Sequence, residues 1–248
     1  MGSGSWTTTS FVNYATSRGY ETDTRGTITS NYSNQEMFKA KNIDASLDPK
    51  GVIRECCDSK EHPNTFPVIL ALDVTGSMGQ AAVEISKRLN NIMTKLYEQV
   101  EDIEFMVMGI GDLSYDSCPI QASQFESDIR IAEQLEKVYL SLVVVVILMN
   151  LILLHGILVP DIPSLIVNRG KKIIITIGDE RLNPYLPIKD NYYGHGLSNV
   201  TGDLLQADVE TKDLYPEVAE KFDVYHINVN HRRGYDQDGI KKSFFKIS

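Results

Sequence analysis

The sequence predicts an α/β fold: a doubly wound, mostly parallel sheet flanked by helices, of the Rossmann-like kind. Two observations predict it. Apolar runs of strand length recur at residues 67–74, 103–112, 171–180 and 223–230, and an amphipathic stretch at 78–100 separates the first two. Buried strands that alternate with helices are typical of a parallel sheet whose strands are joined by right-handed crossovers.

The first apolar run, PVILALDV at 67–74, has no polar residue until Asp73. Strands buried on both faces read as continuous apolar runs, so we expect this strand at the centre of the sheet. The stretch that follows is predicted to be a helix, because its apolar residues recur at steps of three and four and define one face. These residues are Ala82, Ile85, Leu89, Ile92, Leu96 and Val100.

Shorter elements complete the prediction. We expect a short helix near residues 35–43 and a short edge strand at 119–125. Residues 128–140 are predicted to be helical, since Ile131, Leu135 and Val138 fall on one helical face.

The chain divides into two parts by composition. Residues 1–65 are predicted to form a polar N-terminal extension, partly extended, because residues 1–34 are rich in Ser, Thr, Asn and Gly and show no sustained period. Residues 66–248 carry the strand and helix patterns, and we assign them to one α/β domain.

Composition limits the class of function. The formal net charge of −9 argues against a nucleic-acid groove. Three cysteines cannot form a disulfide framework, and no basic segment followed by an apolar one marks a signal peptide at the start. We therefore expect a cytoplasmic protein that binds neither nucleic acid nor membrane.

Oxygen-bearing side chains gather where the predicted strands end. Asp73, Thr75 and Ser77 follow the first strand, and Asp179 ends a later parallel strand. Ligands of such sheets bind beyond the carboxyl ends of the strands, so these four side chains are expected to meet. Hydroxyl and carboxylate oxygens suit a hard divalent ion, and the site is predicted to hold Mg²⁺ or Mn²⁺. The alternative is that Thr75 and Ser77 only cap the next helix.

The segment LDVTGSM, its amphipathic helix and the later IGDE resemble a von Willebrand factor A domain with a metal-ion-dependent adhesion site. The family motif is D-x-S-x-S, and Thr75 keeps the hydroxyl of its middle serine. The resemblance covers about residues 66–230 and is closest to bacterial and phage-type cytoplasmic members. It implies metal ligation by Asp73, Thr75, Ser77 and Asp179. It also implies a divalent-cation-dependent binding module, not an enzyme, whose protein partner presents an acidic residue to the metal.

Two further acids are candidates for the rim of this site. Asp112 follows the second strand, and Glu180 lies beside Asp179. Acids in a turn such as GDLSYD also commonly bond to their own backbone, which would give Asp112 a local role instead.

Residues 141–160, SLVVVVILMNLILLHGILVP, break the α/β pattern. A membrane helix there would separate the strands that build the site, and Asn150 and His155 interrupt the run. The resemblance calls here for a loop with the middle metal ligand and then an amphipathic helix. We hypothesise that 142–167 is a frame-shifted segment, because permitted codons in a shifted frame turn the valines into a glycine run. The nucleotide sequence decides this.

Two other functions stay open on the sequence. DVTGS also resembles the phosphorylated loop of haloacid-dehalogenase-like phosphohydrolases, in which Asp73 would be the nucleophile. Against this, such phosphatases carry a second acid two residues on, where this chain has Thr75. The remaining alternative is a scaffold with a vestigial metal site.

Overall fold

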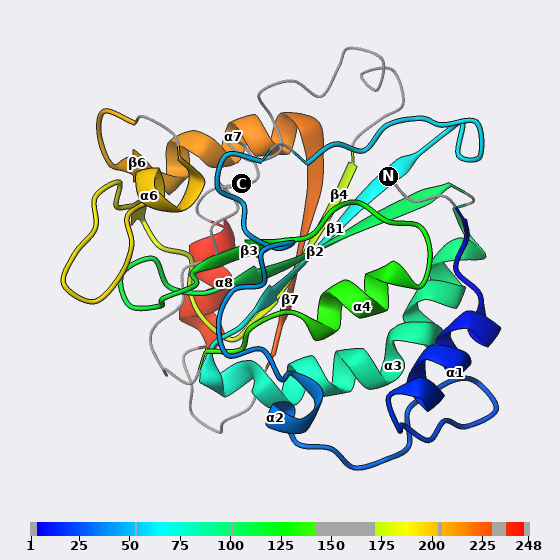
Figure 1. Ribbon diagram of the computed structural model, residues 1–248. Helices are drawn as coiled ribbons and strands as arrows, with labels where there is room; N and C mark the ends of the chain where they lie inside the picture. Colours follow the sequence, from blue (N-terminus) through cyan, green and yellow to red (C-terminus); the bar gives the residue numbers. More distant parts are fainter. Residues whose placement is uncertain are drawn as a thin grey trace.

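The structure is a computed structural model, and the hypothesised frame-shifted segment at 142–167 lies outside the residues that it describes (Figure 1). The described residues are 4–52, 54–100, 102–141, 172–202, 205–229 and 237–245.

The centre of the molecule is a five-stranded, mostly parallel sheet with the order β3-β2-β1-β4-β7 (Figure 1). Every pairing in it is parallel except that of β3, which runs antiparallel to β2. The predicted α/β fold class is confirmed. The strands are β1 (Phe66–Asp73), β2 (Ile103–Ile110), β3 (Ile120–Ala122), β4 (Lys172–Gly178) and β7 (Phe222–Asn228).

Strand β1 is buried on both faces, as its continuous apolar run predicts. Successive side chains of a strand point to opposite faces. Val68, Leu70 and Leu72 accordingly join the hydrophobic cluster on one face, and Ile69 and Ala71 join the cluster on the other. The central position of β1 places its last residue in the middle of the sheet's carboxyl edge.

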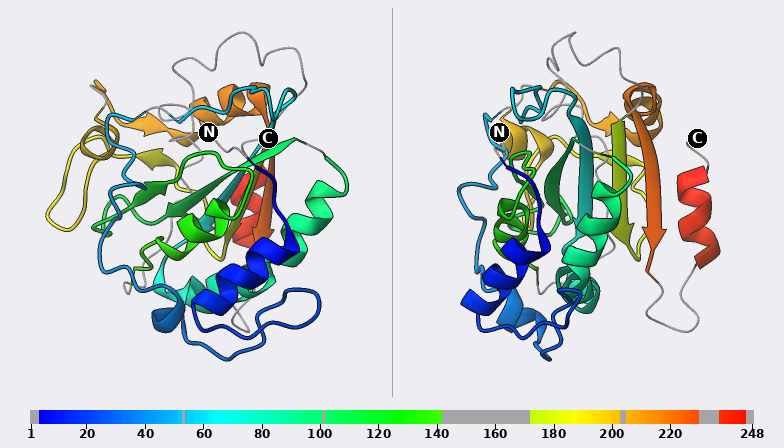
Figure 2. Two further views of the ribbon diagram at one scale, coloured as in Figure 1. Left: turned by 45° about the vertical axis from the view of Figure 1, so that its right-hand side comes forward. Right: turned by 90° about the vertical axis from the view of Figure 1, so that its right-hand side faces the viewer.

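Helices cover the two faces as right-handed crossovers require. One face carries α1 (Thr8–Ser17), α2 (Asn34–Met37), α3 (Gly79–Tyr97) and α4 (Arg130–Glu136) (Figures 1 and 2). The other face carries α6 (Leu197–Thr201), α7 (Thr211–Lys221), α8 (Gln237–Phe245) and the small hairpin of β5 (Tyr185–Leu186) and β6 (Val209–Glu210). Within the described ranges, no helix is both long and apolar enough to cross a bilayer.

The N-terminal segment differs from the expected extended arm. Thr7 caps α1 by accepting a hydrogen bond from the backbone N–H of Ser10, and Phe11 and Ala15 lie on the buried side of the helix. Trp6 packs beside Phe11, with ring centroids 5.5 Å apart. The few apolar residues of this polar stretch are spaced so that they pack on the same core as α3. The average composition of the segment does not show this spacing.

Asn90 of α3 fixes the N-terminal segment with three hydrogen bonds. Its Oδ1 accepts from Trp6 Nε1 at 3.0 Å, and its Nδ2 donates to the carbonyl oxygen of Arg25 at 2.7 Å and to Thr8 Oγ1 at 3.3 Å. Gly26, at φ +74°, passes so close that a Cβ there would fall 2.6 Å from Asn90 Nδ2. The segment is therefore joined to α3 by polar as well as apolar contacts.

Helix α8 packs against β7 through one aromatic pair (Figure 2). The imidazole of His226 stacks on Phe244 with ring centroids 3.9 Å apart, and His226 Nδ1 lies 3.0 Å from Thr176 Oγ1. Burial lowers the pKa of His226 to about 4. On the opposite face of β7, Tyr225 and Ile227 remain more than half exposed.

This histidine predicts a pH dependence of stability. A base whose pKa is lower in the folded state stabilises the fold above its unfolded pKa near 6.5, and that contribution is lost as the pH falls toward 4. We expect His226→Gln to lose about 1 kcal/mol less free energy of unfolding than the wild type between pH 7 and pH 5, after allowing for solvent screening of the partly exposed ring. Urea unfolding at both pH values measures this. Equal losses in the two proteins would contradict it.

Candidate metal centre at the carboxyl edge of the sheet

The site begins where β1 ends. Asp73 is the last residue of β1, and the 3₁₀ turn η1 (Gly76–Met78) leads directly into α3. Two backbone bonds fix the connection: the N–H of Val74 donates to the carbonyl of Ile110 at 3.0 Å, and the carbonyl of Val74 accepts from the N–H of Ser141 at 2.8 Å. The loop is thus held from both sides before any ligand is considered.

A chain of short contacts joins the four predicted metal-site residues. Asp73 Oδ1 accepts hydrogen bonds from the backbone N–H of Thr75 at 2.9 Å and from Thr75 Oγ1 at 2.8 Å. Thr75 Oγ1 lies 3.3 Å from Ser77 Oγ. Ser77 Oγ in turn donates to Asp179 Oδ1 at 3.2 Å. Segments 102 residues apart in sequence therefore bring their oxygens to one place.

Strand β4 pairs directly with β1 and ends in Gly178, beside Asp73. A Cβ at Gly178 would lie 3.3 Å from Asp73 Oδ2, tighter than ordinary van der Waals contact. The carbonyl of Gly178 also accepts from the N–H of Val229, which holds the end of β4 against the residue that follows β7. A side chain at position 178 would therefore crowd the Asp73 carboxylate by a few tenths of an ångström.

Burial dominates the electrostatics of Asp73, which is 2% exposed. Its desolvation raises the pKa of the carboxyl well above the usual value, the bonds from Thr75 oppose this, and the nearby charge of Asp179 raises it further. Asp73 Oδ2 is buried without a hydrogen-bond partner. A buried acceptor without a partner and two neighbouring carboxylates are both costly, and a cation between them would offset both costs.

The donor set fits a hard divalent ion. Because the hydroxyls of Thr75 and Ser77 donate their protons to carboxylates, their lone pairs remain available to a metal. Mg²⁺ prefers six oxygen ligands and usually keeps several waters. Among the described residues, no group of three or more His, Cys, Asp or Glu side chains could hold a metal. Hydroxyls, water or a partner would therefore have to complete the coordination shell.

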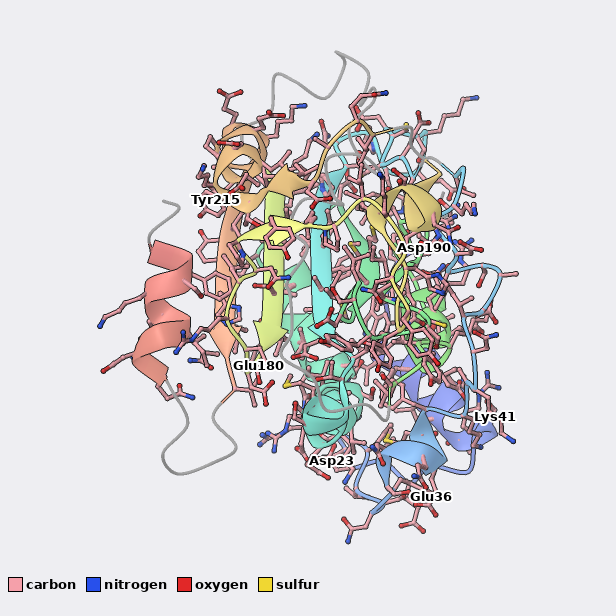
Figure 3. All side chains as sticks on the ribbon, turned by 90° about the vertical axis from the view of Figure 1, so that its left-hand side faces the viewer. Asp23, Glu36, Lys41, Glu180, Asp190 and Tyr215 are labelled. Carbon is pink, nitrogen blue, oxygen red and sulfur yellow. The ribbon has the colours of Figure 1, made fainter. Side chains whose placement is uncertain are left out.

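The two candidate rim acids differ in their surroundings. Asp112 is buried, and its Oδ1 accepts from the backbone N–H of Ser114 at 2.6 Å. Burial raises the pKa of Asp112 to about 6, with a smaller contribution from the charge of Asp116. Asp112 thus makes the bond within its own turn that the local alternative describes, and its place at the rim of the site stays a prediction. Glu180 is half-buried and lies at the carboxyl end of β4, beside Asp179 (Figure 3).

The sequence pattern does not predict the hydrogen bonds that join Asp116 and Ser141. Ser141 Oγ donates to Asp116 Oδ1, and Asp116 Oδ2 accepts from the backbone N–H of Asp112, both at 2.6 Å. Since the N–H of Ser141 also bonds to Val74, this group links the turn after β2 to the loop after β1. No spacing motif connects these residues, and only their shared position at one edge of the sheet could have indicated the link.

Comparisons with known proteins give no family assignment. No protein-family model matches the sequence, and no curated protein matches it. Among solved structures, the chain is similar to the pilus adhesin SpaC from Lactobacillus rhamnosus GG in its open conformation, at 11% sequence identity and a TM-score of 0.49. A second crystal structure of the same adhesin gives 11% identity and a TM-score of 0.46. Each match covers 80% of this chain but only 28% of the adhesin chain.

Proposed function

We propose that this chain is a protein-binding module whose activity depends on Mg²⁺ or Mn²⁺ held by Asp73, Thr75, Ser77 and Asp179. The observation that carries the proposal is the 3.2 Å hydrogen bond from Ser77 Oγ to Asp179 Oδ1, which closes a continuous set of oxygens across two strand ends. Asp73 would supply negative charge to the metal, either as a direct ligand or through a water molecule. The resemblance to von Willebrand factor A domains supports the same assignment.

The partner would supply an acidic residue. The two carboxylates and two hydroxyls leave positions of a six-oxygen shell to water or to an external group. A carboxylate from a partner protein is a hard oxygen ligand and would add the negative charge that this small donor set lacks. Binding would then need both the metal and the partner's acid.

Binding is favoured over phosphoryl transfer by the surroundings of Asp73. A nucleophilic carboxylate must reach the phosphorus atom, whereas Asp73 is only 2% exposed and its Oδ1 accepts two hydrogen bonds from Thr75. The neighbouring position that would need a general acid holds Thr75, which cannot titrate near neutral pH. We therefore propose a binding protein, not an enzyme.

A reducing compartment suits the cysteines. Cys56, Cys57 and Cys118 are all free thiols, and Cys56 and Cys118 are buried. Disulfides are rare in cytosolic proteins, where thiols stay reduced. We propose a cytoplasmic location on this basis.

The hydroxyl at position 75 gives a direct test of the metal site. Thr75→Ser keeps the oxygen and should bind Mn²⁺ within about threefold of the wild type, whereas Thr75→Ala should bind at least about tenfold more weakly. Isothermal titration of MnCl₂ measures both, with MgCl₂ as the second ion. A thermal unfolding scan without metal checks that each variant is folded.

The matched pair separates coordination from helix capping. A cap alone would make Thr75→Ala less stable without changing Mn²⁺ affinity in the folded protein. Equal affinities of the serine and alanine variants would contradict coordination by Thr75. Absence of Mn²⁺ and Mg²⁺ binding to the wild type would leave only the scaffold alternative.

A further inference from the structure

A groove of about 360 Å³ lies on the α2 side of the molecule, between the segment that contains α2 and the residues that follow α4. It is lined by Asn34, Gln35, Phe38, Lys39, Ala40, Lys41, Tyr139 and Leu140.

Both walls of this groove lead to residues that flank the loop of Thr75 and Ser77. On one side, Asn34 packs against the first residue of α3: a Cβ at Gly79 would fall 2.3 Å from Asn34 Nδ2. On the other side, Leu140 precedes Ser141, whose N–H bonds to the carbonyl of Val74. The groove therefore lies near the proposed metal site, on the side of Gly79 and Val74.

The apolar part of the groove is held in place. Phe38 is buried in the main core, and Leu140 packs against the same core. Tyr139 is fixed by a reciprocal pair of bonds to Gln121: its N–H donates to Oε1 at 2.8 Å, and its carbonyl accepts from Nε2 at 2.9 Å. An occupant would meet a largely preformed surface, which lowers the ordering cost of binding.

The charged part of the groove is basic. Lys39 and Lys41 are exposed, and Figure 3 shows Lys41 at the outer surface of the molecule. In the described part of the chain, no carboxylate lies within ion-pair distance of either ammonium. The carboxylate of Glu36 instead accepts from the N–H and the hydroxyl of Ser33, each at 2.7 Å. These bonds lower the pKa of the Glu36 carboxyl, and the charge of Lys39 also acts on Glu36 and lowers it further. Among the residues that the structure describes, however, neither lysine is held in a close ion pair, on a chain of net charge −9.

We infer that this groove binds an acidic segment of the partner protein, continuous with the residue that ligates the metal. The inference rests on the proposed function. One carboxylate of the segment would reach the metal beside Ser77. An apolar side chain would pack on Phe38 and Leu140, and further acids would meet Lys39 and Lys41. Charge complementarity selects this occupant, because opposite potentials favour encounter and discriminate between partners.

The test uses a random twelve-residue peptide library panned against the immobilised full chain in MnCl₂, with Asp73→Asn as the counter-selection. Enriched peptides should contain several Asp or Glu residues and at least one large apolar residue. Fluorescence anisotropy of the best peptide should show at least about tenfold weaker binding to the double variant Lys39→Glu, Lys41→Glu. The matched control, Lys189→Glu with Lys212→Glu, changes the net charge equally and should bind within about twofold.

Titration of Mn²⁺ without peptide separates the two proposals. If the wild type and the groove variant both bind Mn²⁺, but no acidic peptide is enriched or the peptide binds both alike, the groove inference is overturned and the metal site stands. If the wild type binds no Mn²⁺, the proposed function itself fails. Weakening by the control pair equal to that by the groove pair would show a general charge effect and would also overturn the inference.

Discussion

Asp73→Asn is expected to weaken Mn²⁺ binding by at least about 100-fold, since even residues that only orient metal ligands contribute 10- to 100-fold. Asparagine keeps the shape of the side chain, and its Oδ1 can still accept the two bonds from Thr75. The substitution removes the negative charge beside Asp179 and replaces the unpartnered acceptor Oδ2 with an amide NH₂ group. Isothermal titration of MnCl₂ into each protein measures the change.

The same substitution should leave the metal-free protein at least as stable as the wild type. Burial and the charge of Asp179 raise the pKa of Asp73, so the ionised carboxylate is unfavourable in the fold without a cation. The control is Asp213→Asn in the first turn of α7, which removes one charge far from the site and should not change Mn²⁺ affinity. Unchanged Mn²⁺ binding by Asp73→Asn would refute the metal centre.

Phe11→Ala is expected to lower the free energy of unfolding by about 3–5 kcal/mol, the usual cost of truncating a buried phenylalanine. Phe11 is 1% exposed and lies between two aromatic rings, 5.5 Å from Trp6 and 6.2 Å from Tyr14. Alanine would leave a cavity between α1 and the main core, and the sheet cannot move in to close this cavity. Urea denaturation followed by circular dichroism gives the value.

Asn13→Ala is the matched control on the same helix. Asn13 is exposed, so its replacement should change the free energy of unfolding by no more than about 0.5 kcal/mol. A loss below about 1 kcal/mol in Phe11→Ala would mean that the N-terminal segment is not part of the cooperative core.

The parallel strands could be predicted from sequence because strands that are buried on both faces appear as continuous apolar runs. The runs that became β1, β2 and β4 contain almost no polar residue, and the three- and four-residue spacing predicted α3. From these elements, topology alone brings Asp73 and Asp179 to one edge, and the structure places them there. The chemistry of a metal at that edge stays a prediction.

Other features could not be predicted because they depend on a few contacts between distant segments. The N-terminal segment has a polar composition, yet Phe11 and Ala15 suffice to anchor it to the core. The bond between Ser141 and Asp116 joins two irregular loops, where no periodic pattern exists. Sequence periodicity reports which face of an element is buried, but not which loops meet.

Helix α3 is a rod about 28 Å long, since its 19 residues rise by about 1.5 Å each. One end is continuous with the loop of Ser77, and Asn90, along its length, is clamped to the N-terminal segment. A movement of α3 along its axis on metal binding would have to move the N-terminal segment with it or break the hydrogen bonds of Asn90. Through Asn90, the N-terminal segment is therefore mechanically coupled to the helix that begins at the loop of Ser77.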